Sequence, residues 1–231
     1  MNLIEKIYEA GVVGAGGAGF PSHVKYDCEA EYLIINGAEC EPLLQTDKFL
    51  MREFPEEILA AAELVAENIG AKKIYFATKK KYTEEIACLK RIIEAEGYQN
   101  IELFLMESYY PAGDEQIMVY EITGRIVPEG GIPLQVGTVV TNVGTLYNSY
   151  RAVNELPVTD KYVSVLGEVR EPRVIKVPIG TSVKKCIEAA GGSNINDYAV
   201  ILGGPMMGSN LLAEEIEQAV ITKTDGAVIV V

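Results

Sequence analysis

The feature that most constrains the fold is an alternation of short apolar runs with amphipathic helical segments between residues 32 and 106. Strands are predicted at Tyr32–Asn36, Lys73–Thr78 and Ile101–Met106. The intervening segments Pro55–Ile69 and Thr83–Glu96 place apolar residues at helical spacing. Strands separated by helices pair in parallel, because a parallel connection needs a long crossover. The sequence therefore predicts an α/β domain with a parallel, Rossmann-like sheet and helices on both faces.

The rhythm of the chain changes after Leu156-Pro157, where short strands follow one another closely. Strand, strand, helix and strand within about fifty residues are typical of a β-grasp module. The predicted domains are therefore residues 1–157 and residues 158–231. The remaining predicted elements are helices at 2–10, 117–123, 146–154 and 182–190, and strands at 138–141, 162–166, 174–177, 198–202, 219–222 and 227–231.

The balance of charge excludes several partners. The chain has 33 acidic and 20 basic residues and a net charge of −13. A nucleic acid or an anionic membrane surface would be repelled by this charge. No apolar run approaches the ~20 residues of a membrane span, and the N-terminus lacks a signal-peptide pattern. We expect a cytoplasmic protein.

Cysteine and histidine usage argues against a metal centre. Cys28, Cys40, Cys88 and Cys186 lack the spacing of a zinc ribbon or an iron–sulfur cluster, and His23 is the only histidine. Free thiols are expected in a cytosolic protein. The sequence therefore predicts no metal site, no iron–sulfur cluster within this chain and no catalytic triad.

The stretch GAGGAGFPSHVK, from Gly14 to Lys25, is the strongest candidate for a ligand loop. Glycine is used where a ligand approaches the backbone closely, and exposed amides in such a loop form a concavity for phosphate. The loop also matches the dinucleotide fingerprint G-x-G-x-x-G. That fingerprint requires a preceding strand, whereas a helix is predicted here. We therefore interpret the stretch as a phosphate-cofactor loop outside an ordinary Rossmann motif.

Polar residues stand at three later junctions between elements. Asn36 ends the first strand and Glu39 follows it, Asp114 and Glu115 precede a helix, and Asn142 follows another strand. Ligands bind at the carboxyl ends of strands in open α/β sheets. The carboxylates also fit a solvated turn or a helix cap, and the sequence alone leaves these alternatives open. We expect the three junctions to converge with the glycine loop on one rim.

Five segments in order carry a family resemblance. GAGGAGFPSHVK, NGAECEP, YPAGDE, TNVGT and GGPMMG together resemble the RnfC family, which shares its flavin domain with the FMN-bearing, NADH-oxidising subunit of respiratory complex I. Within that family the loop ending and the phrases ECEP and YPAGDE are most similar to PduS-type cobalamin reductases. The resemblance implies an FMN-binding α/β domain followed by a soluble-ligand-binding β-grasp (SLBB) module.

The resemblance also implies roles for particular residues. FMN would contact the glycine loop, the first strand end and the start of a late helix, and NADH would meet Phe20 and the acidic groups near the flavin ring. Ala38 departs from complex I, which has aspartate there, and the cysteine clusters of a ferredoxin-like region are absent from this sequence. The implied cofactor-binding residues are Gly14, Gly16, Gly17, Phe20, Lys25, Asn36, Glu39, Gly113, Asp114, Glu115, Asn142 and Thr145.

Two hypotheses of function follow. The first is FMN-dependent oxidation of NADH, with electrons passed to an iron–sulfur or cobalamin acceptor in a partner or another domain. It places the protein in the cytoplasm, in a bacterial microcompartment or on the cytoplasmic face of a membrane complex. The second is a non-catalytic module that binds a ligand or partner in a larger redox complex. An ordinary NAD-dependent dehydrogenase is disfavoured by the helix before the glycine loop.

Overall fold

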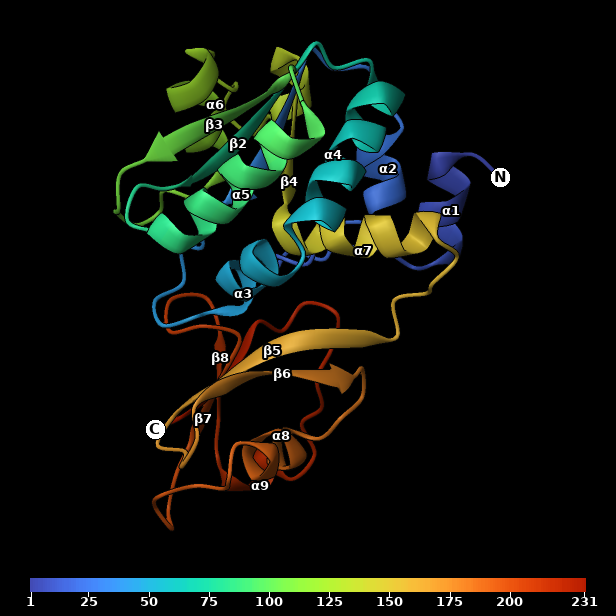
Figure 1. Ribbon diagram of the computed structural model, residues 1–231. Helices are drawn as coiled ribbons and strands as arrows, with labels where there is room; N and C mark the ends of the chain where they lie inside the picture. The colour runs from blue at the N-terminus through green and yellow to red at the C-terminus, as the bar shows by residue number, and fades with distance from the viewer.

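The structure is a computed structural model that describes residues 1–231, and it contains two separate sheets (Figure 1). The first is a four-stranded parallel sheet with the strand order β3-β2-β1-β4. Its domain begins with two short helices that flank the glycine loop. The elements of this domain are α1 (Leu3–Glu9), α2 (Ser22–Tyr26), β1 (Tyr32–Gly37), α3 (Thr46–Glu53), α4 (Pro55–Ile69), β2 (Lys73–Lys79), α5 (Thr83–Glu96), β3 (Ile101–Met106), α6 (Glu115–Thr123), the 3-10 helix η1 (Pro133–Val136), β4 (Thr138–Asn142) and α7 (Val143–Val153).

Both faces of the parallel sheet are covered, as the sequence predicts. Leu33 and Ile35 of β1 are fully buried in a cluster that includes residues of α4, α5 and α7. Ile34, between them, points to the opposite face and packs in a second cluster with Met118 and Val119 of α6. Successive strand residues face opposite sides of a sheet, so an uninterrupted apolar strand requires helices on both.

The strand order fixes where a ligand site is expected. From β1 the chain proceeds outward through β2 to β3, and then returns across the sheet through α6 and η1 to β4 on the other side of β1. The strand order therefore reverses at β1, with β2 and β3 on one side of it and β4 on the other, which makes the β1–β4 boundary the topological switch point. In open α/β sheets ligands bind outside the carboxyl ends of the strands at this point.

The second sheet agrees with the predicted β-grasp module. Its strand order is β6-β5-β9-β7-β8, with β5 and β6 antiparallel and β9 parallel to β5. Val163 of β5 and Val228 of β9 pack in one core with Val183 of α8. The elements of this domain are β5 (Asp160–Gly167), β6 (Arg173–Pro178), α8 (Val183–Ala189), β7 (Val200–Leu202), β8 (Ser209–Leu211), α9 (Ala213–Ile216) and β9 (Ala227–Val230).

The two domains meet along β5, which lies against α3 and α7 (Figure 1). The ring of Tyr162 on β5 lies 5.2 Å from that of Phe49 and 5.9 Å from that of Tyr147, centroid to centroid. Ser164 Oγ accepts a hydrogen bond from Gln45 N at 3.0 Å, deep in the same contact. Aromatic packing and a hydrogen bond to the buried Ser164 therefore hold the β-grasp domain against the end of the parallel sheet.

Two sequence expectations were wrong. Ala219–Thr222 is not a strand and contributes one isolated bridge, because Asp225 Oδ2 accepts from Thr222 N at 2.7 Å and turns the chain. Helix α7 begins at Val143, three residues earlier than predicted, because Asn142 is its N-cap. Helices α2, α3 and α9 and strand β8 were not predicted.

Candidate functional site

A single large cavity of about 830 Å³ lies at the carboxyl ends of β1 and β4 and is lined by both domains. This volume is in the range of small-molecule and cofactor sites. The whole set of predicted site residues lines it, so the structure brings the three junctions and the glycine loop together on one rim. These residues are Gly14, Gly16, Gly17, Phe20, Lys25, Asn36, Glu39, Gly113, Asp114, Glu115, Asn142 and Thr145.

Backbone hydrogen bonds close the glycine loop. Gly14 N donates to Phe20 O at 2.8 Å, and Gly19 N donates to Gly14 O at 3.2 Å. Ala15 N donates to the hydroxyl oxygen of Thr145 at 2.9 Å, which fastens the loop to the first turn of α7. The predicted residue Thr145 is buried and therefore positions the loop from beneath.

The middle of the loop leaves three amides without partners. The N–H groups of Gly16, Gly17 and Ala18 donate to no acceptor of the protein. Gly17 has a φ of +110°, and a β-carbon built there would have no neighbour within 4 Å. Unpaired amides beside open space form the concavity that binds anionic oxygens. The loop therefore fits the phosphate of a cofactor.

Asn36 connects two of the junctions. Its Nδ2 donates to Gly113 O at 2.9 Å, and its Oδ1 accepts from Ala38 N at 3.0 Å. A β-carbon on Gly113 would lie 2.7 Å from Cys40 Sγ and 2.8 Å from Ala38 O, so only glycine fits this close approach. The amide of Asn36 thus fixes the loop after β1 against the loop before α6.

Asn142 plays the corresponding part on the neighbouring strand. It is the register partner of Asn36 across the β1–β4 pair. Its Oδ1 accepts from Gly144 N at 2.8 Å and caps α7, while its Nδ2 donates to Asp47 Oδ2 at 2.8 Å. The side chain therefore links β4, α7 and the first turn of α3 at the floor of the cavity.

The two adjacent carboxylates at the start of α6, for which the sequence left a helix cap and a ligand contact as alternatives, have different partners. Asp114 Oδ1 accepts from the amides of Gln116 at 3.0 Å and Ile117 at 3.1 Å, so this residue is a helix cap that also lines the cavity. Glu115 instead accepts from Lys25 Nζ at 2.8 Å. Lys25 donates as well to the Val140 carbonyl at 2.9 Å. The predicted lysine is therefore already paired.

Carboxyl groups gather where the loop after β1 meets α3. Burial raises the pKa of Glu39, and the nearby charges of Asp47 and Glu41 raise it further, while its hydrogen bond from Glu41 N and the charge of Lys79 act in the opposite direction. Burial also raises the pKa of Asp47, and the hydrogen bond from Asn142 opposes that shift. The environment of the cavity therefore stabilises the protonated forms of Glu39 and Asp47.

The β-grasp domain closes the cavity with groups that were not among the predicted site residues. Lys161 of β5 lines it, and its Nζ lies 3.4 Å from Ala15 O in the glycine loop. Burial lowers the pKa of Lys161, and the charges of Asp47 and Asp225 oppose that shift. Across the cavity, Met206 N donates to Glu41 Oε2 at 2.8 Å.

Asp47 and Lys161 are the main residues that the sequence analysis missed. The pair Thr46-Asp47 before an apolar–polar run is a typical helix start, so a signal for α3 and its buried carboxylate is present in the sequence. No local pattern marks Lys161, since its place in the cavity depends on the packing of β5 against α3 and α7. The predicted residue Phe20 lines the rim of the cavity, and it is 48% exposed.

Neither a metal-binding cluster nor a membrane-spanning helix is found in the structure. No group of three or more His, Cys, Asp or Glu side chains is arranged to hold a metal ion. All four cysteines are free thiols. None of the helices combines the length and the apolar character that a bilayer crossing needs.

An amide-lined loop, a topological switch point and a closing β-grasp domain define a nucleotide-cofactor-binding α/β protein. Comparison with known families gives the same class. Residues 7–151 match the Nuo51 FMN-binding domain, and residues 162–210 match the SLBB domain. The chain belongs to the Nuo51 FMN-binding domain family, as the resemblance to the RnfC and complex I proteins implied.

Individual relatives support the same family. The cobalamin reductase PduS of Citrobacter freundii is 39% identical over 227 residues, which cover 98% of this chain and 49% of that protein. A component of the Na+-translocating ferredoxin:NAD+ oxidoreductase complex of Acetobacterium woodii is 33% identical over 216 residues, 91% of this chain and 48% of that protein. The chain spans about half the length of the curated relatives it matches.

The fold is also found in a solved redox enzyme. A chain of the NAD+-reducing NiFe-hydrogenase in its H2-reduced state superimposes with a TM-score of 0.83 at 26% identity, covering 99% of this chain and 46% of that one. Family and relatives together point to FMN-binding electron transfer in redox complexes.

Proposed function

We propose that this chain binds FMN in the cavity between its two domains and accepts electrons from NADH. The observation that carries the proposal is the row of unpaired amides at Gly16–Ala18, which faces the cavity beside the switch point of the sheet. When bound, FMN supplies the hydride-accepting chemistry, so the protein needs no catalytic side chain. Its part is to hold two rings at reactive distance.

Each group of cavity residues has a proposed task. The glycine loop donates amides to the phosphate, and Asn142 with Thr145 keeps that loop seated on α7. Asn36 and Gly113 hold the two loops that border the ring, with Glu39 and the Lys25–Glu115 pair beside them. Phe20 is placed at the rim, where an exposed aromatic ring offers a stacking surface for NADH.

The relatives suggest where the electrons go next. One is a cobalamin reductase, and another belongs to a ferredoxin:NAD+ oxidoreductase complex. By analogy, electrons from this chain pass to an iron–sulfur domain or partner subunit, or to a cobalamin-dependent system. Cytoplasmic, microcompartment-associated or membrane-complex-associated settings are all compatible with that role. The proposed domain division is residues 1–157 and residues 158–231.

An anaerobic titration tests the proposal. FMN is added to the purified chain, its binding is followed by the visible spectrum, and NADH is then added. We expect binding at micromolar concentrations and loss of the flavin absorbance with NADH. Absence of binding contradicts the function. Binding without bleaching removes the NADH part and favours the alternative of a non-catalytic module within a redox complex, to which Ala38 in place of an acidic residue also points.

A further inference from the structure

The charges that line the cavity raise a question about how a phosphate is held there. A phosphate monoester carries a charge of about −1.5 to −2 at neutral pH. The side chains lining the cavity include seven carboxylates but only two cations, Lys25 and Lys161. The amides of the glycine loop supply partial charges only. A full positive charge beside the phosphate would offset part of this excess of negative charge.

Lys25 is not available for this task. Its ammonium group donates to Glu115 Oε1 at 2.8 Å and to the Val140 carbonyl at 2.9 Å. The Glu115 carboxylate neutralises its charge, and the carbonyl takes a second of its three protons. A lysine paired in this way contributes little net attraction to an additional anion.

Lys161 has the opposite environment. The charges of Asp47 and Asp225 act on it, but its ammonium group forms no direct ion pair with either, and its one side-chain hydrogen bond is the long one to the carbonyl of Ala15. The nearby carboxylates have other donors, because Asp47 accepts from Asn142 at 2.8 Å and Asp225 from Thr222 N at 2.7 Å. The ammonium group thus lies at the glycine loop with protons to donate.

The position of Lys161 relative to the amides indicates its ligand. Ala15, whose carbonyl it contacts, directly precedes the unpaired amides of Gly16–Ala18. We propose that Lys161 of the β-grasp domain is the cationic partner of the cofactor phosphate, so that the flavin site is complete only when both domains are packed together. This inference rests on the proposed function and adds a phosphate-specific residue to it.

Comparison of FMN with riboflavin, which lacks the phosphate, isolates this role. Dissociation constants of both flavins are measured for the full 231-residue chain and for the variant Lys161→Met, which keeps most of the apolar stem. We expect the affinity for FMN to fall about 10- to 100-fold, as for a lost charge-assisted hydrogen bond, and the affinity for riboflavin to stay unchanged. Lys161→Arg is expected to keep the preference for FMN.

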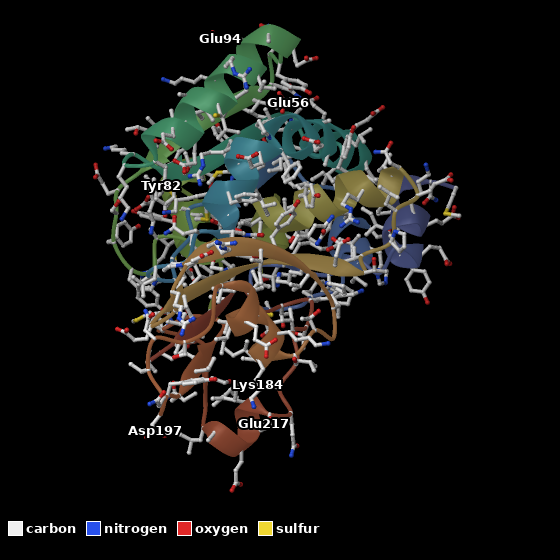
Figure 2. The ribbon with its side chains drawn as sticks, turned by 60° about the horizontal axis from the view of Figure 1, so that its bottom comes forward. Glu56, Tyr82, Glu94, Lys184, Asp197 and Glu217 are labelled. Carbon is white, nitrogen blue, oxygen red and sulfur yellow. The ribbon has the colours of Figure 1, made fainter.

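The control is Lys185→Met, which removes an exposed lysine of the same domain. Its neighbour Lys184 lies on the side of the β-grasp domain that points away from the α/β domain (Figure 2). Equal loss of both flavins in Lys161→Met, or a wild-type chain that binds FMN no better than riboflavin, overturns the inference and leaves the flavin function intact. A wild-type chain that binds neither flavin overturns the proposed function itself.

If thermal unfolding shows that Lys161→Met does not fold, the role of Lys161 is tested instead by measuring how flavin binding to the wild type and to Lys161→Arg depends on salt. The preference of the wild type and of Lys161→Arg for FMN over riboflavin is expected to decrease as ionic strength rises, since salt screens the attraction between charges. A preference that is independent of salt overturns the role of the lysine.

Discussion

The α/β domain and the β-grasp domain both line the cavity, but they contribute different chemical groups to it. The first provides backbone amides in the glycine loop and short polar side chains such as Asn36 and Asn142 at strand ends. The second provides the long side chain of Lys161 and the turn that contains Gly204 and Met207. The parallel sheet and its loops thus set the shape of the cavity and the orientation of its polar groups. We propose that the β-grasp domain supplies the positive charge beside the phosphate.

This difference explains why the site residues of the α/β domain can be predicted from the sequence better than those of the β-grasp domain. The carboxyl ends of parallel strands meet at one edge of a sheet, so the strand pattern alone predicts that Asn36 and Asn142 lie close together. Their pairing in register confirms that expectation. Lys161 reaches the same cavity only because Tyr162 packs on Phe49 and Tyr147, and such a contact between domains has no periodic signature.

The corrections have the same physical origin. The apolar stretch Ala219–Thr222 has the composition of a strand, yet the Asp225 carboxylate captures the amide of Thr222 and ends the extended run. Local composition predicts which residues prefer a strand, whereas the hydrogen bonds available nearby decide whether the strand forms. The start of α7 also differs from the prediction, because the side chain of Asn142 caps the helix as well as lining the cavity.

The largest expected effect comes from filling the glycine loop. Gly16→Val adds a branched side chain whose β-carbon would lie 3.4 Å from the side chain of Asn142, against the amides that we assign to the phosphate. We expect FMN affinity to fall by about 100-fold or more, since the variant both removes the close approach and displaces a positioning residue. Fluorescence titration with FMN measures this change.

A matched control adds a side chain of similar bulk elsewhere. Ala189→Val lies on an exposed part of α8 and is expected to leave FMN affinity unchanged. Thermal unfolding shows whether each variant is folded. Unaltered FMN affinity in a folded Gly16→Val protein would contradict the assignment of phosphate binding to the α/β domain.

An intermediate effect is expected at the second lysine of the cavity. Lys25→Met leaves Glu115 without its partner, and we expect both FMN and riboflavin to bind about 5-fold more weakly, the scale of a modest, partly exposed ion pair. The double variant Lys25→Met/Glu115→Gln removes the pair without changing the net charge, and it should recover most of the affinity. Isothermal titration of each variant with the two flavins measures these factors.

The two lysines are thus predicted to behave differently. Loss of Lys25 weakens both flavins, whereas loss of Lys161 weakens only the one with a phosphate. If Lys25→Met weakens the binding of FMN and leaves that of riboflavin unaffected, Lys25 rather than Lys161 is the cationic partner of the phosphate.

The smallest expected effect concerns the buried carboxyl group of Glu39. Because its pKa is raised in the folded state, the folded protein holds this proton more tightly than the unfolded chain. Its contribution to stability is therefore fully present below the ordinary carboxyl pKa of about 4 and is lost as the pH rises through the raised value. Glu39→Gln should remove that loss and stabilise the protein by on the order of 1 kcal/mol at neutral pH.

Urea unfolding at several pH values measures this difference. Asp47, Glu41 and Lys79 face the same carboxyl group and stay unchanged in the variant. Glu94→Gln is the control, since Glu94 is exposed at the far end of α5 from the cavity (Figure 2). A Glu39→Gln protein whose advantage over the wild type does not grow with pH would show that this carboxyl group is not perturbed.

The central claim, a flavin site shared by two domains, is tested most directly by amide hydrogen exchange with and without FMN. Bound FMN is predicted to slow exchange in Gly14–Gly19 of the α/β domain and also in the β-grasp segments that line the cavity, at the start of β5 and in the turn Thr224–Gly226. Lys185 and its neighbours on α8 should exchange at the same rate in both states. Protection confined to the α/β domain would contradict the account.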